Sequence, residues 1–204
     1  MKPASKKSKP PAPAPKLSRD DWLDAAFSAV VEGGFDAMRI LTLADKLGVT
    51  RGSFYWHFAD HAALLAALLQ RWRERELQTE VQLRADTGAD PRADLERLLQ
   101  AALAHAGADL ENMRFELALR SLGRREQQVA AMLAEIDGLR MALFVDMFKR
   151  LGTDAKSASE LASLFYLCIV GSHQALSRPN NPSRMKEYLH GIIARHLIRR
   201  PIPS

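Results

Sequence analysis

The sequence predicts an all-α protein with two helical domains. Apolar residues recur at helical spacing in segment after segment, and no stretch shows the alternation typical of a β-strand. Glycine and proline mark several boundaries, so that about nine helices are expected along the chain. Segments before residue 60 are short and those after it are longer. We therefore expect a small N-terminal domain followed by a larger C-terminal bundle.

Composition narrows the class of protein. The chain has 204 residues, of which 47% are hydrophobic, enough for a sizeable core. Its single cysteine, Cys168, lies in the apolar run LFYLCIV and excludes a disulfide framework or a cysteine metal site. No apolar run is long enough to span a bilayer, and the charged N-terminus lacks the hydrophobic segment of a secretion signal. We expect a cytoplasmic protein with no membrane partner.

The N-terminus is basic and rich in proline. The net charge is +5, and the start MKPASKKSKPPAPAPK holds lysines but no acid. Such a segment cannot bury apolar surface, so residues 1–17 are expected to form a disordered tail. The lysines could attract phosphates without sequence preference, and a solvated terminus with no role is an equally good interpretation.

Two helices are expected after the tail. The first runs through DDWLDAAFSAVVE, capped by Ser18 or Asp20, and ends at Gly33-Gly34. The second is expected over 36–47, ended by Gly48 in a left-handed C-terminal cap. The apolar side of the first holds Trp22, Ala25, Ala26, Phe27 and Val30.

The next stretch, LGVTRGSFYWHF, predicts a third helix over 50–58, with Thr50 supplying an oxygen acceptor at its start. On a helical wheel, Phe54 and Phe58 share a core side. Gly52 and Trp56 fall on the opposite side, flanked by Ser53 and Tyr55, and this face is suited to contact a partner. Residues 18–64 are therefore expected to form a helix-turn-helix unit.

Residues 65–204 are expected to form a helical bundle. The Asp90-Pro91 pair predicts a cap followed by proline at the first helical position. The expected helices span 61–84, 91–105, 111–122, 127–151, 157–177 and 184–199.

The segment LADKLGVTRGSFYWHF, followed by HAALL and preceded by FDAMRI, resembles the tetracycline-repressor-like (TetR) family of bacterial transcriptional regulators. The resemblance implies an N-terminal DNA-binding domain and a C-terminal domain for ligand binding and dimerisation. It further implies a homodimeric, ligand-responsive repressor on a pseudo-palindromic double-stranded DNA operator. The third helix would then enter the major groove. The residues implied to contact DNA are Arg39, Thr50, Arg51, Gly52, Ser53, Tyr55, Trp56, His57 and His61.

Two positions depart from the family pattern. His61 stands where a lysine often meets a phosphate, and it is mostly neutral at pH 7. Arg39 stands where a threonine or serine often begins the second helix. It cannot cap a helix but can donate to a phosphate, and a simple solvated arginine is the alternative.

The bundle is expected to hold a small-molecule effector of unknown class and a dimer interface. Each of these residues could instead belong to ordinary core or surface. The candidate pocket residues are Trp72, His105, Asn112, Met113, Arg114, Phe115, Arg120, Asp137 and Phe144. The candidate interface residues are Leu161, Leu164, Phe165, Cys168, Ile169, Gly171, Leu176, Leu189, Ile192, Ile193, His196 and Leu197.

Other functions have weaker support in the sequence. His57 and His61 have a zinc-compatible spacing, but further ligands are not evident, so no metal or other cofactor is expected. No nucleophile elbow or phosphate loop appears, so an enzyme, or a helical small-molecule-binding protein without DNA function, is the weaker alternative. A nonspecific architectural DNA-binding protein would use the tail and Arg39 without sequence preference.

Overall fold

The structure is a computed structural model that describes residues 17–103, 108–176 and 183–198. Within these ranges the chain is all-α, as predicted, with short helices first and long ones after them. A 3₁₀ turn, η1 (Phe35–Ala37), precedes the second helix, and a π-helical turn, η2 (Ala194–Ile198), continues the last one. The α-helices are α1 (Arg19–Gly33), α2 (Ile40–Lys46), α3 (Arg51–Phe54), α4 (His61–Ala85), α5 (Pro91–Leu103), α6 (Ala108–Gly123), α7 (Gln127–Arg150), α8 (Ala155–Leu176) and α9 (Ser183–Ile193).

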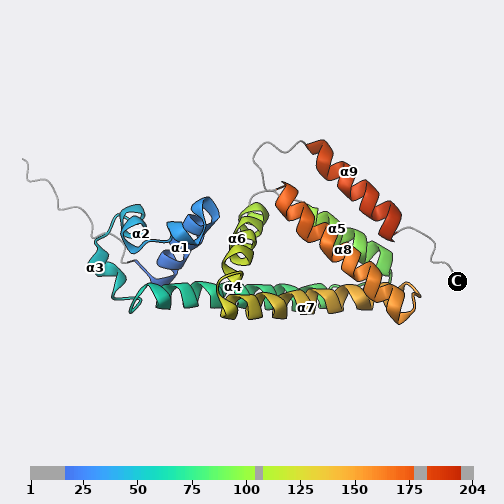
Figure 1. Cartoon of the computed structure of the whole chain (residues 1–204), viewed down its shortest axis with the longest axis horizontal. Helices are drawn as coiled ribbons and strands as arrows, with labels where there is room; N and C mark the ends of the chain where they lie inside the picture. Colours follow the sequence, from blue (N-terminus) through green and yellow to red (C-terminus); the bar gives the residue numbers. More distant parts are fainter. Residues whose placement is uncertain (1–16, 104–107, 177–182, 199–204) are drawn as a thin grey trace, which may run out of the picture.

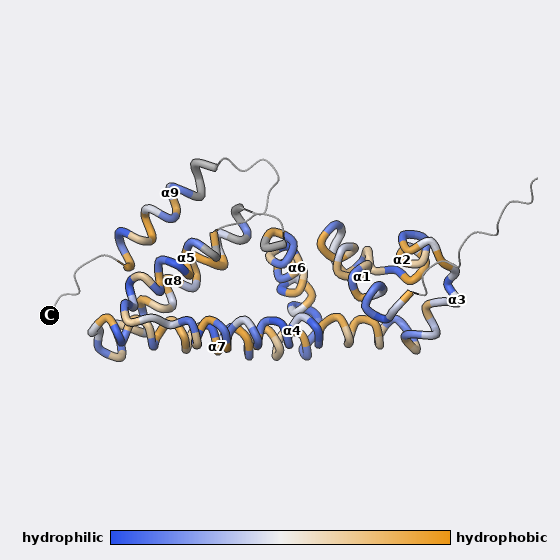
Figure 2. Tube along the Cα trace, turned by 180° about the vertical axis from the view of Figure 1, so that it is seen from behind, coloured by the Kyte–Doolittle hydropathy of each residue, from blue (hydrophilic) through white to orange (hydrophobic). Residues whose placement is uncertain are grey.

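The long helices α4 and α7 lie side by side and form the base of the molecule (Figure 1). Helices α1 to α3 gather at one end of this base, α5, α8 and α9 at the other, and α6 stands between them. Hydrophobic and hydrophilic residues alternate along α4 and α7, as expected for helices with one buried side (Figure 2). Helix α4 runs without a break from the N-terminal unit into the bundle, across the expected boundary at residue 64.

Two hydrophobic clusters form the core. The first joins α1 to α4 with α6 and the N-terminal half of α7, around the fully buried Trp22 and Phe115. The second joins α5, α8 and α9 with the C-terminal half of α7, around Phe148 and Phe165. Since α7 contributes to both clusters, it connects the two ends of the molecule.

The boundaries of α1 follow from its sequence. Ser18 caps it: Ser18 Oγ accepts from the Asp21 amide at 3.2 Å, and the Asp21 carboxylate accepts from the Ser18 amide at 2.7 Å. The Ser18 amide and the Ser18 hydroxyl both donate to the Asp21 carboxylate, which lowers the pKa of Asp21. The helix ends before Gly34, whose φ of 73° lies in the left-handed region that glycine tolerates. The predicted start at Ser18 and stop at Gly33-Gly34 are confirmed.

Two predicted elements were wrong in detail, and the end of a third lies outside the described residues. The helix expected over 36–47 is divided, because Arg39 is extended (φ −104°, ψ 133°) between η1 and α2. The helix expected over 50–58 is α-helical only to Phe54. The amides of Tyr55, Trp56 and His57 bond to carbonyls three residues back, which tightens the chain into turns. Helix α5 is described to Leu103, so the expected end at His105 lies outside the described residues.

Candidate nucleic-acid interface

Helices α2 and α3 are joined by a tight turn that depends on Gly48. Its φ is 68°, as the predicted left-handed cap requires. The Val49 amide donates to the Ala44 carbonyl at 3.0 Å, which closes the turn. Thr50 takes the N-cap position with extended backbone, but its side chain makes no capping hydrogen bond, so the predicted oxygen acceptor is wrong.

The core side of the third segment is occupied by two phenylalanines. Phe54 and Phe58 are buried and their rings stack with centroids 5.6 Å apart. The Trp22 ring of α1 meets Phe54 edge-on at 5.3 Å. The predicted inward orientation of both phenylalanines is confirmed. Their burial fixes which face of the segment points outward.

The outward face carries Trp56 and Tyr55. The Trp56 side chain is 88% exposed and Tyr55 is 48% exposed. A tryptophan so exposed gains little from folding, which favours a role in contact with a partner. Gly52 is also exposed, and a Cβ added there would meet only Thr50 Oγ1, at 3.6 Å. Packing within the chain therefore does not require glycine at this position.

Arg51 and Tyr55 form a polar pair on this face. Arg51 Nε and Nη2 donate to Tyr55 Oη at 3.2 and 2.8 Å, and the guanidinium carbon lies 5.7 Å from the ring centroid. The hydroxyl accepts from Arg51, so its own hydrogen is available to a further acceptor. A cation and a phenol held together in this way form a suitable contact for a phosphate oxygen.

The other predicted contact residues lie just before α2, in α3 and the turn after it, and at the start of α4. Arg39 at the start of α2 makes no helix-capping bond, as predicted, and its Nε donates to the Asp36 carbonyl at 3.2 Å. Ser53 and His57 are half-buried. The ring of His61 is already engaged, because its Nε2 lies 2.7 Å from the Met38 carbonyl, to which it must donate. His61 thus ties the start of α4 to the segment before α2.

The structure adds an exposed leucine that the sequence reasoning missed. Leu41, in the first turn of α2, is exposed. The signal was present, because Leu41 falls off the apolar side that Leu43, Ala44 and Leu47 define.

The comparisons with known proteins concern first this N-terminal unit. The family described as "Bacterial regulatory proteins, tetR family" matches residues 23–68, which include α2, the turn and α3. The tetracycline repressor protein class D of Escherichia coli is 40% identical over 50 residues, which are 24% of this chain and 23% of that protein. The likeness to this family is carried by the N-terminal part of the chain, from α1 to the start of α4. The chain spans only about a quarter of the length of the curated relatives that it matches.

Solved structures extend the likeness of fold to nearly the whole chain. A transcriptional regulator from Rhodococcus sp. Rha1 has a TM-score of 0.73 at 17% identity, covering 92% of this chain and all of that one. A regulator from Saccharomonospora viridis in complex with choline has a TM-score of 0.73 at 19% identity, covering 89% of this chain and 98% of that one. These structures confirm the predicted all-α fold, with a helix-turn-helix unit followed by a larger set of helices.

The residues predicted to line an effector pocket do not converge on one cavity. Trp72 and Phe115 belong to the first core cluster, whereas Phe144 belongs to the second. Trp72 and Phe115 also line a small cavity of about 50 Å³ beside α1. Met113 is buried, Asn112 is half-buried, and His105 lies outside the described residues.

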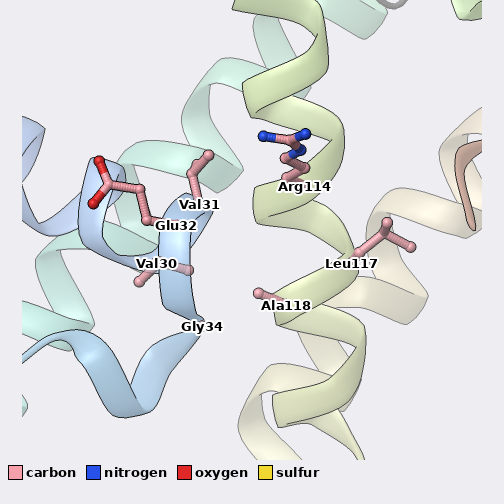
Figure 3. Close-up of a pocket in the computed structure, with 7 residues that line it drawn as sticks. All are labelled: Val30, Val31, Glu32, Gly34, Arg114, Leu117 and Ala118. Carbon is pink, nitrogen blue, oxygen red and sulfur yellow. The ribbon is translucent and has the colours of Figure 1, made fainter. Parts of the chain in front are cut away.

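The larger hollows are open clefts. One of about 610 Å³ lies between the end of α1, with Val30, Val31 and Glu32, and α6, with the predicted Arg114 (Figure 3). A second of about 310 Å³ lies between α6 and α7 and is lined by the predicted Arg120 and Asp137. Arg120 and Asp137 are bonded to each other there, with Arg120 Nη2 2.8 Å from Asp137 Oδ1.

The predicted dimer residues divide between the protomer's own core and its surface. Phe165, Ile169 and Ile193 are buried in the second core cluster, because α8 packs that side against α5 and α7. The side chain of Leu176 lies outside the described residues. Leu161, Cys168, Leu189 and Leu197 are half-buried, and Leu164, Gly171, Ile192 and His196 are exposed. Two exposed apolar side chains that sequence reasoning missed, Leu167 on α8 and Tyr188 on α9, add to this surface.

No helix in the described part of the chain is long and apolar enough to cross a membrane.

Proposed function

We propose that the chain is a sequence-specific DNA-binding transcriptional regulator that acts as a ligand-responsive repressor. The observation that carries this proposal is the face of α3 and the following turn. There Trp56, Tyr55 and Gly52 are exposed while Phe54 and Phe58 hold the segment in place. No packing or stability argument accounts for such a face, whereas contact with a duplex does. The proposal assigns the chain no catalytic reaction.

The face has groups for both kinds of DNA contact. Arg51 and Ser53 lie in α3, from which side chains can reach base edges in the major groove. The Arg51 and Tyr55 pair and the Arg39 guanidinium supply donors for phosphates. Trp56 can pack on a sugar or on a thymine methyl group. The missing side chain at Gly52 allows the backbone to approach the duplex closely.

A homodimer accounts for the exposed apolar residues of α8 and α9. Leu164 and Leu167 of α8 and Tyr188 and Ile192 of α9 are exposed, and both helices lie at the end of the molecule away from α3 (Figure 1). Pairing this surface with its copy would bury it and present two α3 segments to one duplex. Two recognition segments related by two-fold symmetry match a pseudo-palindromic operator with half-sites a whole number of helical turns apart.

An effector would act by favouring one spacing of the two DNA-binding units. A ligand that binds more tightly to a conformation with the wrong spacing lowers operator affinity by that difference in binding energy. The choline complex of the Saccharomonospora viridis regulator supports the general idea of a small ligand in this fold. The open cleft between α1 and α6 is a candidate place for it, because it lies where the two domains meet (Figure 3).

The test is a fluorescence-anisotropy titration of the purified protein against duplexes that tile the DNA upstream of its own gene. Each titration is repeated with excess random duplex at a stated salt concentration, because nonspecific affinity depends steeply on salt. Binding to one tile that resists the competitor supports a specific regulator. Equal, competitor-sensitive binding to every tile would instead favour the architectural DNA-binding protein that the net charge of +5 also permits.

A further inference from the structure

The Phe27 ring connects helix α1, at the N-terminal end of the molecule, to helices α4 and α6. Phe27 of α1 stacks on the buried Phe115 of α6, with centroids 4.9 Å apart and planes at 24°. The Arg75 guanidinium of α4 lies 5.7 Å from the centroid of the same Phe27 ring. A second ring, Phe35 of η1, also contacts Phe115, at 5.8 Å. Helices α4 and α6 therefore both hold α1 through Phe27.

The residues that follow Arg75 and Phe115 in the sequence both belong to a charged cluster. Glu76 comes directly after Arg75, and Glu116 comes directly after Phe115. Arg140 of α7 joins the two acids, donating to Glu76 at 2.7 Å and to both carboxylate oxygens of Glu116 at 3.0 Å. We call the whole set the Glu116 cluster, and its members are Glu76, Glu116, Arg120, Asp137, Arg140 and Tyr166.

The remaining bonds tie α6 to α7 and α8. Arg120 donates to Glu116 at 2.6 Å, to Asp137 at 2.8 and 3.0 Å, and to the Tyr166 hydroxyl at 3.0 Å. The cluster thus joins α4, α6, α7 and α8, and two of its members directly follow the residues of α4 and α6 that contact Phe27 of α1.

The two arginines of the cluster keep the buried Glu116 side chain ionised. The Glu116 side chain is only 8% exposed. Burial alone would raise the pKa of Glu116, but the charges and hydrogen bonds of Arg140 and Arg120 outweigh it and lower the pKa to about 2. Desolvation makes buried ion pairs weak contributors to stability unless every partner is in place. Such pairs are better suited to specifying one arrangement of helices than to holding them together.

We propose that the Glu116 cluster positions the DNA-binding domain, by holding α4 and α6 in the one arrangement in which Phe115 and Arg75 grip Phe27. Glu76, Glu116 and Arg140 are thus positioning residues that act on α3 from a distance through α1. If the cluster is broken, α1 samples a wider range of orientations on the bundle. This consequence for DNA rests on the proposed function, because a broader range of orientations reduces the fraction of molecules that are competent to bind an operator.

The first arm of the test is independent of DNA. Amide hydrogen exchange is measured by mass spectrometry on the full chain, for the wild type, Glu116→Gln and Glu76→Gln. The second variant is a milder change, because Glu76 has a single partner in the cluster, Arg140. The matched control is Glu135→Gln, which removes another carboxylate that pairs α7 with α4, through Arg73 at 2.6 Å, but lies outside the cluster.

We expect exchange in α1 to rise about threefold or more in both cluster variants, and to rise more in α1 than in α5, because local opening reports local stability. The control should leave α1 at the wild-type rate. Unchanged α1 exchange in Glu76→Gln would overturn the proposal, even if Glu116→Gln fails to fold. A parallel rise in α5 would also overturn it, because that pattern indicates general loosening of the fold.

The second arm measures anisotropy titrations with the duplex tile that the wild type prefers. Both cluster variants should bind it about threefold or more weakly, as expected for a coupling of this kind, and the control should bind as the wild type does. Wild-type affinity in both variants would overturn the proposal. If the wild type prefers no tile, the proposed function fails, and the exchange arm alone still decides whether the cluster positions α1.

Discussion

Gly52→Ala is expected to stabilise the protein and weaken its binding to DNA. The backbone of Gly52 is not in the left-handed region, and an added Cβ would meet only Thr50 Oγ1, at the ordinary contact distance of 3.6 Å. Alanine therefore fits the folded chain and restricts the unfolded one, a gain of about 0.4–1 kcal/mol. In the proposed complex with DNA, the same methyl group would project from an exposed face toward the duplex. Loss of one close contact should cost about tenfold in affinity, or about 1.4 kcal/mol.

The assay pairs urea unfolding with anisotropy titration on the preferred duplex. Gly138→Ala is the matched control, because Gly138 lies exposed within α7 and a Cβ there would meet nothing within 4 Å. It should stabilise the chain to a similar degree and leave DNA affinity unchanged. Undiminished affinity of Gly52→Ala would refute a close approach of this backbone to DNA. A loss of folding stability would refute the packing argument.

Three further predictions concern folding and assembly. Phe54→Ala should lower the free energy of unfolding by about 3–5 kcal/mol because the ring is fully buried, whereas Trp56→Ala should change it by less than about 0.5 kcal/mol; equal losses in urea titrations would refute the assignment of faces. The lowered pKa of Glu116, about 2 against an ordinary 4.5, contributes stability that is present above pH 4.5 and lost as the pH falls toward 2. Glu116→Gln should therefore cost about 3 kcal/mol near pH 6 and progressively less below pH 4.5, and a cost independent of pH would contradict this origin. If the wild type forms the proposed dimer, the double variant Leu164→Glu, Leu167→Glu should sediment as a monomer, whereas Val81→Glu, at an exposed apolar position on α4, should not alter the oligomer.

The recognition face could be predicted from sequence because it depends on local periodicity. Phe54 and Phe58 are four residues apart, so one must share the core side with the other, and Trp56 between them must point away. The predicted left-handed cap at Gly48 was also right, and Gly34, predicted only as part of a helix stop, has positive φ as well, since glycine serves where other side chains are strained. Local pattern did not reveal the extended conformation of Arg39, which divides the second helix.

The Glu116 cluster could not be predicted, because its members lie far apart in sequence. Glu76 and Arg140 are 64 residues apart, and Arg140 is 24 residues from Glu116. Taken singly, a glutamate or arginine in an amphipathic helix is more often on a solvated face than buried. The aromatic residues expected to line a pocket raise the converse difficulty. Large apolar side chains line pockets and fill cores alike, so the sequence cannot distinguish the two roles. Only the packing shows that Phe115 and Phe144 lie in two separate core clusters.

Under the proposed function, the face of Trp56 and Tyr55 reads a specific DNA sequence. The most direct test is to measure, for the wild type and for the double variant Tyr55→Ala, Trp56→Ala, the ratio of affinities for the preferred duplex and for random duplex. Both side chains are exposed, so the variant should fold as the wild type does. The ratio is expected to collapse toward one in the variant, while weak, salt-sensitive binding to random duplex persists. A ratio that stays at the wild-type value in the folded variant would overturn the proposed recognition of DNA by this face.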